Sequence, residues 1–215
     1  SEPRLLTVSG DRLFYIATTE AGTHLFVTDG SASGTMQLTV ESQSHISSQP
    51  KPYTYLAAVN NGVVFQGFSA ATGVELWFSG GTPATTGLLK DLNTLPGSSN
   101  SYPRDFVAFA GQIYFSAAYG DYATFDLRGD SELWRTDGTP AGTVLIDTAS
   151  TYHQSLTPAG NTLFFTGDSF DIWKSDGTAQ GTQLVRNIRP AYPYQESLTL
   201  TPVGAAYVES IREGL

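Results

Sequence analysis

The chain has 215 residues, of which 40% are hydrophobic and only 14% are charged, a composition typical of a folded globular protein. Its 11 Lys and Arg residues against 20 Asp and Glu residues give a net charge of −9, which disfavours binding to the phosphate backbone of a nucleic acid. Cysteine is absent, which excludes disulfides and thiolate metal sites, and no apolar run reaches the ~20 residues of a membrane-spanning helix. We therefore expect neither a nucleic-acid partner nor insertion into a membrane.

Two short runs rich in β-branched and aromatic residues open the chain, at Leu5–Val8 and Leu13–Ala17, with Ser9-Gly10-Asp11 between them. Short apolar runs divided by such a turn predict an antiparallel β-hairpin. Three similar pairs of runs follow further along the chain: Thr54–Val59 with Val63–Gly67, Phe106–Phe109 with Ile113–Ala117, and Leu156–Pro158 with Leu163–Thr166. Each pair predicts the first two strands of one structural unit.

A longer segment follows each pair, and its four copies align without gaps: His24–Leu38, Glu75–Leu89, Glu132–Ile146 and Asp171–Val185. The third copy reads ELWRTDGTPAGTVLI, which predicts a third strand, a Gly-containing turn and a fourth strand. Successive turn positions are separated by 51, 57 and 39 residues: Asp29, Gly80, Asp137 and Asp176. Spacings of this size are typical of propeller blades, in which each blade is a four-stranded antiparallel sheet.

The sequence therefore predicts an all-β fold, a β-propeller-like array of four four-stranded blades plus a partial fifth, as a single domain over 1–215. The repeats span approximately 4–41, 54–93, 105–148 and 155–189, with the partial repeat over 197–210. The partial repeat supplies only first and second strands, and so does the start of the chain, so the two ends cannot complete one blade together. We expect either that the chain is a fragment of a longer protein or that another copy completes the half-blade.

An acidic residue recurs at the turn, as Asp29, Asp137 and Asp176, while Gly80 replaces it in the second copy. An Asp in a turn accepts hydrogen bonds from backbone N–H groups just ahead of it. We therefore interpret the three Asp residues as structural turn residues and not as catalytic acids. We expect Asp137 and Asp176 to be buried at the tips of their hairpins.

A large aromatic residue occupies one position of the predicted third strand in every copy, as Phe26, Trp77, Trp134 and Trp173. A ring that recurs once per blade is suited to filling the space between adjacent blades. Stacking on a sugar would instead require an exposed ring. We expect these three Trp side chains to lie between blades.

The segments Glu132–Thr143 and Asp171–Thr182 resemble the ELWxxDGT repeats of large secreted or surface-attached bacterial proteins. The Gly-containing approach to that motif is matched by Ala71–Trp77, and the stretch after it is matched loosely by Asp91–Gly97. The first copy departs from the motif, because it begins His24-Leu25-Phe26. The resemblance implies a propeller-like repeat fold, a secreted or cell-surface location and no catalytic residues.

The longest irregular insertion, Ala118–Ser131, lies between the second and third predicted strands of the third repeat. Insertions on one face of a repeat array commonly form its binding face. The candidate binding residues in this insertion are Tyr119, Asp121, Tyr122, Asp126, Arg128 and Asp130. Its three carboxylates offer oxygen ligands to Ca²⁺, although they lack the regular spacing of a Ca²⁺ loop. We expect no resident cofactor, and Ca²⁺ is the metal that the insertion suggests.

No motif for a specific chemistry stands out, since the chain has no Gly-rich phosphate loop, paired-His metal motif or nucleophile elbow. His24, His45 and His153 are far apart in the sequence. We expect a non-catalytic extracellular module for binding, adhesion or scaffolding, with a protein or carbohydrate ligand. The alternatives are a propeller-type hydrolase or lyase with its active site at the channel mouth, and a purely structural spacer.

Overall fold

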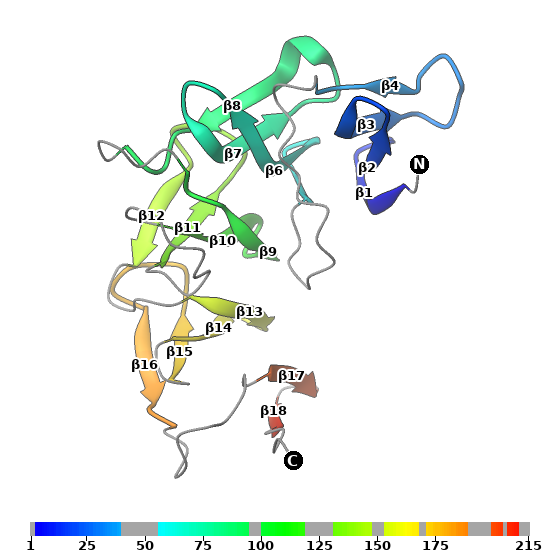
Figure 1. The fold of residues 1–215 in the computed structure, drawn as a ribbon. Coiled ribbons are helices and arrows are strands. Elements are labelled where there is room, and N and C mark those ends of the chain that lie inside the picture. Colours follow the sequence, from blue (N-terminus) through cyan, green and yellow to red (C-terminus); the bar gives the residue numbers. More distant parts are fainter. Residues whose placement is uncertain are drawn as a thin grey trace, which may run out of the picture.

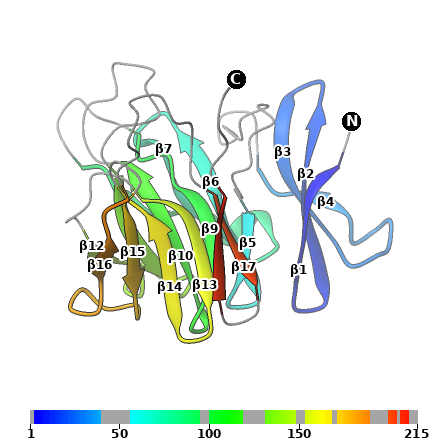
Figure 2. The same cartoon turned by 90° about the horizontal axis from the view of Figure 1, so that it is seen from below.

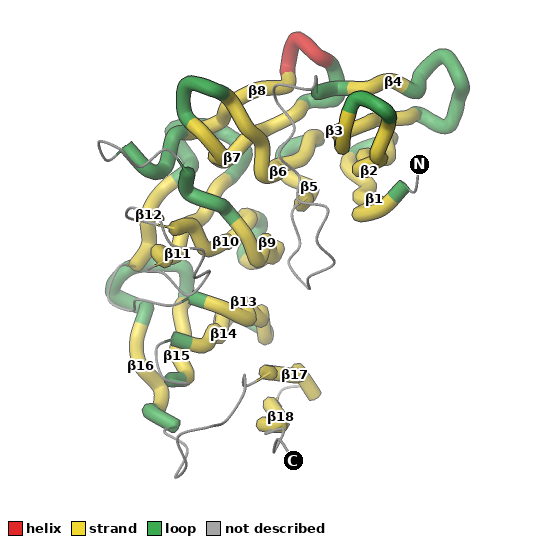
Figure 3. The backbone as a smooth tube through the Cα atoms, in the orientation of Figure 1, coloured by secondary structure: helices red, strands yellow, loops and turns green. Residues whose placement is uncertain are grey.

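The computed structural model describes residues 3–39, 56–94, 100–118, 131–147, 153–167, 171–188, 199–203 and 206–210. Within these ranges the fold is all-β, and a short 3₁₀ turn at Pro83–Thr85 is the one helical element (Figure 3). There are four four-stranded antiparallel sheets and one two-stranded sheet, each a simple meander in chain order. The predicted fold class is confirmed.

We number the four-stranded sheets blades 1 to 4 and call the two-stranded sheet the terminal hairpin. Blade 1 contains β1 (Arg4–Ser9), β2 (Arg12–Thr19), β3 (Gly22–Thr28) and β4 (Met36–Gln37), and blade 2 contains β5 (Leu56–Val59), β6 (Gly62–Ser69), β7 (Gly73–Ser79) and β8 (Thr86–Lys90). Blade 3 contains β9 (Arg104–Phe109), β10 (Gln112–Ala118), β11 (Ser131–Thr136) and β12 (Val144–Asp147), and blade 4 contains β13 (Gln154–Ala159), β14 (Thr162–Thr166), β15 (Ile172–Ser175) and β16 (Gln183–Arg186). The terminal hairpin contains β17 (Thr199–Val203) and β18 (Ala206–Ser210).

The blades follow one another around an arc, with blade 1 at one end and the terminal hairpin at the other (Figure 1). First strands contact first strands, because β1 meets β5, β5 meets β9, β9 meets β13, and β13 meets β17. These strands line the inside of the arc, and β8, β12 and β16 lie on its outside (Figure 1). The arrangement is that of successive propeller blades, and the predicted partial fifth repeat takes the place of the next blade.

The connections alternate between the two ends of each blade, as the meander requires. The turns from the first to the second strand and from the third to the fourth strand lie at one end, which we call the turn end (Figure 2). The second strands end and the third strands begin at the opposite end of each blade, where the fourth strands also end, and we call it the loop end (Figure 2).

Three apolar cores lie between consecutive blades. The core between blades 1 and 2 includes Phe14, Leu25, Phe65 and Trp77. Blades 2 and 3 enclose a core that includes Leu76 and Trp134, and blades 3 and 4 enclose one against which Trp173 packs. Because a middle blade is covered on both faces, its strands are near-continuous apolar runs, as the fully buried GVVF segment at the start of β6 shows.

The predicted position of the Trp side chains is confirmed for Trp77 and Trp134, which are buried between blades. Trp173 lies in the same place between blades 3 and 4, where it is half-buried. The prediction that Asp137 and Asp176 are buried is wrong. Asp176 is exposed and Asp137 is partly exposed, because the turns that carry them project beyond the ends of the strands.

Candidate functional site

The recurring Asp at the turn end organises the chain reversal between the third and fourth strands. Asp137 Oδ1 accepts hydrogen bonds from the backbone N–H of Thr139 at 2.8 Å and from its hydroxyl at 2.7 Å. Asp176 with Thr178, and Asp29 with Ser31, form the same pair of bonds. In all three cases these bonds hold the pKa of the carboxyl group below its usual value, because they favour the charged form.

The Asp carboxylate fits inside the turn because the fifth residue after the Asp is a glycine. A Cβ atom on Gly142 would overlap the carboxylate oxygens of Asp137, and Gly181 stands in the same relation to Asp176. In blade 2 both residues differ: Gly80 replaces the Asp, and Thr85 replaces the glycine. There the Thr85 hydroxyl accepts the N–H of Thr82 at 3.2 Å, so a hydroxyl replaces the carboxylate oxygen.

The turns of blades 2 and 4 also touch the preceding blade. Arg12 of blade 1 donates to the Gly80 carbonyl at 2.8 Å, and Arg135 of blade 3 donates to the Gly177 carbonyl at 3.1 Å. Gly177 has a φ of +94°, and a Cβ atom at this position would overlap the Tyr114 hydroxyl. Glycine is therefore required there for backbone conformation and for close approach of the neighbouring blade. These turns therefore hold neighbouring blades together, and we call such contacts between blades joints.

A buried carboxyl group lies at the loop end, where the third strand of blade 2 meets the segment leading to blade 3. Glu75 is fully buried, and its Oε2 accepts the Leu92 N–H at 2.8 Å and the Ser101 hydroxyl at 2.6 Å. Burial raises the pKa of Glu75 to about 7, and the charge of Asp91 acts in the same direction, while the two hydrogen bonds oppose the rise. Glu75 thus ties β7 to the connection between two blades.

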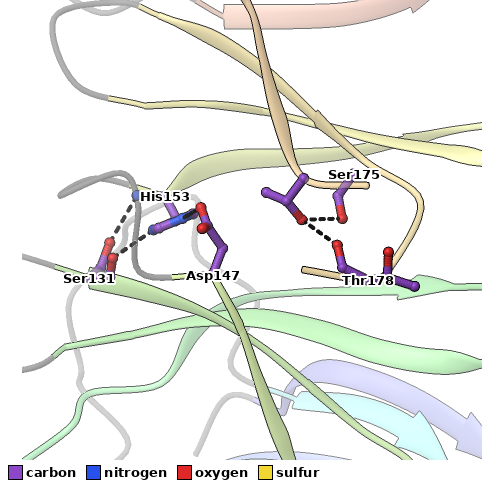
Figure 4. A network of polar contacts seen from close by, with 6 residues as sticks. Ser131, Asp147, His153, Ser175 and Thr178 are labelled. Atoms are coloured by element: carbon purple, nitrogen blue, oxygen red, sulfur yellow. Dashed lines mark hydrogen bonds and ion pairs between the residues drawn. The ribbon is translucent and has the colours of Figure 1, made fainter. Parts of the chain in front are cut away.

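The equivalent joint between blades 3 and 4 uses a histidine (Figure 4). The backbone N–H of His153 donates to the Ser131 hydroxyl at 2.9 Å, and its Nδ1 lies 2.6 Å from the Ser131 carbonyl oxygen. Its Nε2 lies 3.2 Å from Asp147 Oδ2. Glu132 occupies the position of Glu75 in the repeat, accepts the Trp134 indole N–H at 3.1 Å, and has its pKa raised by burial.

Among the described residues, one carboxyl group with a raised pKa belongs to an inner strand of the arc. Asp105 on β9 has its pKa raised to about 6 by burial, and the adjacent positive charge of Arg104 opposes that rise. Its φ of +58° belongs to a region that residues other than glycine rarely adopt, and Leu5 and Ser155 share this conformation at the same place in β1 and β13. Because the conformation recurs from blade to blade, it is a feature of the repeat.

The six candidate binding residues of the insertion, Tyr119, Asp121, Tyr122, Asp126, Arg128 and Asp130, lie outside the described residues, as does His45. The structure does place the insertion, because Ala118 and Ser131 are paired across β10 and β11. The insertion therefore leaves and rejoins the sheet at one point of the loop end.

His24 is buried in blade 1 at the position that Glu75 occupies in blade 2. In the described part of the chain, no three His, Asp or Glu side chains are grouped so that they could hold a metal.

The joints at both ends were missed by sequence reasoning. The first residue of each ELW-type segment is His24, Glu75, Glu132 or Asp171, and its repeated polar character was the available signal for the joints at the loop end. Arg12 and Arg135 gave no such signal, because they lie on different strands of their blades.

Among the described residues, no helix is both long enough and apolar enough to cross a bilayer.

Comparison with known proteins supports the fold alone. No family model and no curated protein matches the chain. Among solved structures, a puromycin hydrolase is similar at a TM-score of 0.51 and 16% identity, over 97% of this chain and 32% of that one. Its S511A mutant complexed with PGG gives a TM-score of 0.52 at 13% identity, over 96% and 32%. The chain thus spans about a third of the length of these structures, and the likeness is to propeller-type folds.

Proposed function

We propose that the chain is a non-catalytic binding module of a secreted or surface-attached protein, and that its ligand, a protein or a carbohydrate, binds at the loop end. The observation that carries the proposal is the pairing of Ala118 with Ser131, which anchors the longest non-repeating insertion at that end. Variable loops on a rigid scaffold are the usual place for ligand recognition. The extracellular setting rests on the resemblance to ELWxxDGT repeats.

The use of the polar residues in the described blades supports a scaffold role for the repeating part. Asp137 stabilises a turn, Glu75 binds a connection between blades, and Arg135 joins blade 3 to blade 4. Because equivalent residues make equivalent structural contacts in several blades, the fold itself explains why these polar groups are present. Ligand recognition then falls to residues that do not repeat.

A glycan array and an array of extracellular proteins, each probed with and without Ca²⁺, test this proposal. We expect binding that is lost in the triple variant Asp121→Asn, Asp126→Asn and Asp130→Asn. Asp11→Asn is the matched control, because Asp11 is an exposed acid at the turn end whose carboxylate is 3.8 Å from Arg12 Nε. Equal loss in both variants, or no loss in the triple variant, would contradict binding at the insertion.

The alternative is a propeller-type hydrolase or lyase, and Asp105 is the observation that favours it. A carboxyl group with a pKa raised to about 6 on a strand that lines the inside of the arc has the properties of a general acid. Turnover of glycoside, polyuronide or peptide substrates that disappears in Asp105→Asn and persists in the insertion variant would establish it.

A further inference from the structure

Two acidic residues lie on neighbouring strand ends at the loop end of blade 2. Glu75 is near the start of β7, and Asp91 directly follows β8. Leu76 pairs with Lys90 across these two strands, so Glu75 and Asp91 are the next residues beyond that pair. The N–H of Leu92, which follows Asp91, donates to Glu75 Oε2 at 2.8 Å. The two carboxyl groups are therefore close enough for the charge of Asp91 to raise the pKa of Glu75.

Each of these carboxyl groups has one buried oxygen without a hydrogen-bond partner, namely Glu75 Oε1 and Asp91 Oδ1. Glu75 is fully buried, and the bonds from Leu92 and Ser101 both go to its other oxygen. A buried carboxylate oxygen that accepts no bond is costly in free energy, and a second negative charge nearby adds to that cost. The two unpartnered oxygens, and not the acidity of the segment alone, point to a positively charged ligand.

The described residues supply no counter-charge to this pair. Lys90 is the basic residue next to Asp91 in the sequence, but its Nζ donates to the Thr143 carbonyl at 2.7 Å and lies over the Trp134 ring. Its charge therefore belongs to a joint with blade 3. In the described part of the chain, hydrogen bonds alone oppose the rise in the pKa of Glu75, and no basic side chain contributes.

We propose that Glu75 and Asp91 bind a Ca²⁺ ion, which ties the end of β8 to the start of β7 at the loop end. Carboxylate oxygens suit hard cations, and Ca²⁺ accepts irregular sites in which carbonyl, amide and water oxygens complete the coordination. Two carboxylates are therefore sufficient, although no third His, Asp or Glu side chain joins them among the described residues. Asn93, which is also buried, donates to the Asn100 carbonyl at 3.0 Å and so holds two points of the same connection together.

Calorimetric titration of the 215-residue chain with CaCl₂ after treatment with EDTA tests the proposal, with MgCl₂ as a second titrant. We expect Ca²⁺ to bind and to raise the melting temperature, and Mg²⁺ to bind more weakly because it requires near-octahedral geometry. Glu75→Gln keeps an oxygen that can accept the bonds from Leu92 and Ser101, so the variant should fold. This variant and Asp91→Asn should each bind Ca²⁺ roughly tenfold more weakly or worse, because each removes one negative charge from the site.

Protons should compete with Ca²⁺ for this site. Because the pKa of Glu75 is raised to about 7, the ionised form becomes scarce below that pH, and the affinity for Ca²⁺ should fall about tenfold between pH 8 and pH 6. In Asp91→Asn the same change of pH should have a smaller effect, since the charge that helps to raise the pKa of Glu75 is gone.

Glu132→Gln is the matched control. Glu132 is the counterpart of Glu75 in blade 3, but Thr148 stands at the position of Asp91, so this variant should bind Ca²⁺ like the wild type. The site is also separate from the insertion, and binding should persist in the triple variant Asp121→Asn, Asp126→Asn and Asp130→Asn. Absence of Ca²⁺ binding at pH 8 would overturn the proposal. So would binding that survives unchanged in Glu75→Gln and Asp91→Asn, or that disappears in the triple variant.

Discussion

The carboxylate of Asp137 occupies the space that a side chain at position 142 would fill, so the aspartate and Gly142 depend on each other. Gly34 and Gly181 stand in the same relation to Asp29 and Asp176. Where the repeat has a glycine at the first position, as Gly80, the second position carries Thr85, whose hydroxyl takes the place of the carboxylate. The two positions therefore act as one unit.

This dependence predicts non-additive stability in blade 2. Gly80→Asp alone should destabilise the protein by about 1–3 kcal/mol, because the new side chain meets Thr85 Oγ1, already 3.0 Å from where a Cβ atom at position 80 would lie. Adding Thr85→Gly should recover most of that loss, since the pair recreates the turn of blade 3. Urea unfolding of both single variants and the double variant measures the coupling. Additive effects would show that the two positions are independent.

Removal of the turn carboxylate should weaken the protein without unfolding it. Asp137→Ala loses the hydrogen bonds to the Thr139 N–H and hydroxyl, and we expect a loss of about 1 kcal/mol in the free energy of unfolding, as for a lost helix cap. The pKa of Asp137 is lowered in the folded state, so its contribution is present above the ordinary carboxyl pKa and is lost as pH falls through the lowered value. Denaturation at neutral and acid pH should thus show a smaller difference between wild type and variant in acid.

Trp134 should be a larger determinant of stability than the aromatic residue at the same position of blade 1. Trp134→Ala should cost about 3–5 kcal/mol, because the ring is enclosed between blades 2 and 3. Phe26→Ala is the control, and it should cost clearly less because Phe26 is half-buried. Chemical denaturation of the two variants compares them directly. Equal costs would show that the Phe26 ring is as enclosed as the Trp134 ring.

Glu75 should make stability depend on pH near neutrality. Its pKa is raised to about 7, so its contribution is fully present below the unfolded pKa of about 4.5 and is lost as pH rises through 7. Asp105 and Glu132 titrate in the same direction, so Glu75→Gln is needed to isolate the effect. We expect this variant to gain on the order of 1–3 kcal/mol relative to wild type between pH 5 and pH 8. A difference that does not change with pH would mean that Glu75 is ionised throughout.

The fold was accessible from the sequence because its signal is repeated. Three copies of an ELW-type or related segment, each followed by a turn and a β-rich run, predicted the strand order of blades 2 to 4, and the weaker His24-Leu25-Phe26 copy still folds as β3. The exposure of Asp137 was not accessible, because an Asp makes the same local bonds whether or not its turn is covered by other chain segments.

The joints between blades could not be predicted, for a different physical reason. The bond from Arg135 to the Gly177 carbonyl joins residues 42 positions apart, and its existence depends on how two blades are placed in space. The burial that raises the pKa of Glu75 likewise comes from the connection to the next blade, at Leu92 and Ser101. Sequence periodicity indicates the strands within one blade, and it carries no information about the distance between residues of two different blades.

Replacement of residues 119–130 by an Asn-Gly turn between Ala118 and Ser131 tests the central claim most directly, namely that repeating residues build the scaffold and the insertion recognises the ligand. Ala118 and Ser131 are already paired, so a two-residue turn closes β10 and β11 into a hairpin. We predict that the shortened protein keeps the free energy of unfolding of the wild type and loses its binding on the glycan and protein arrays. Binding that survives the replacement, or that is lost in Asp137→Ala with the insertion intact, would contradict the account.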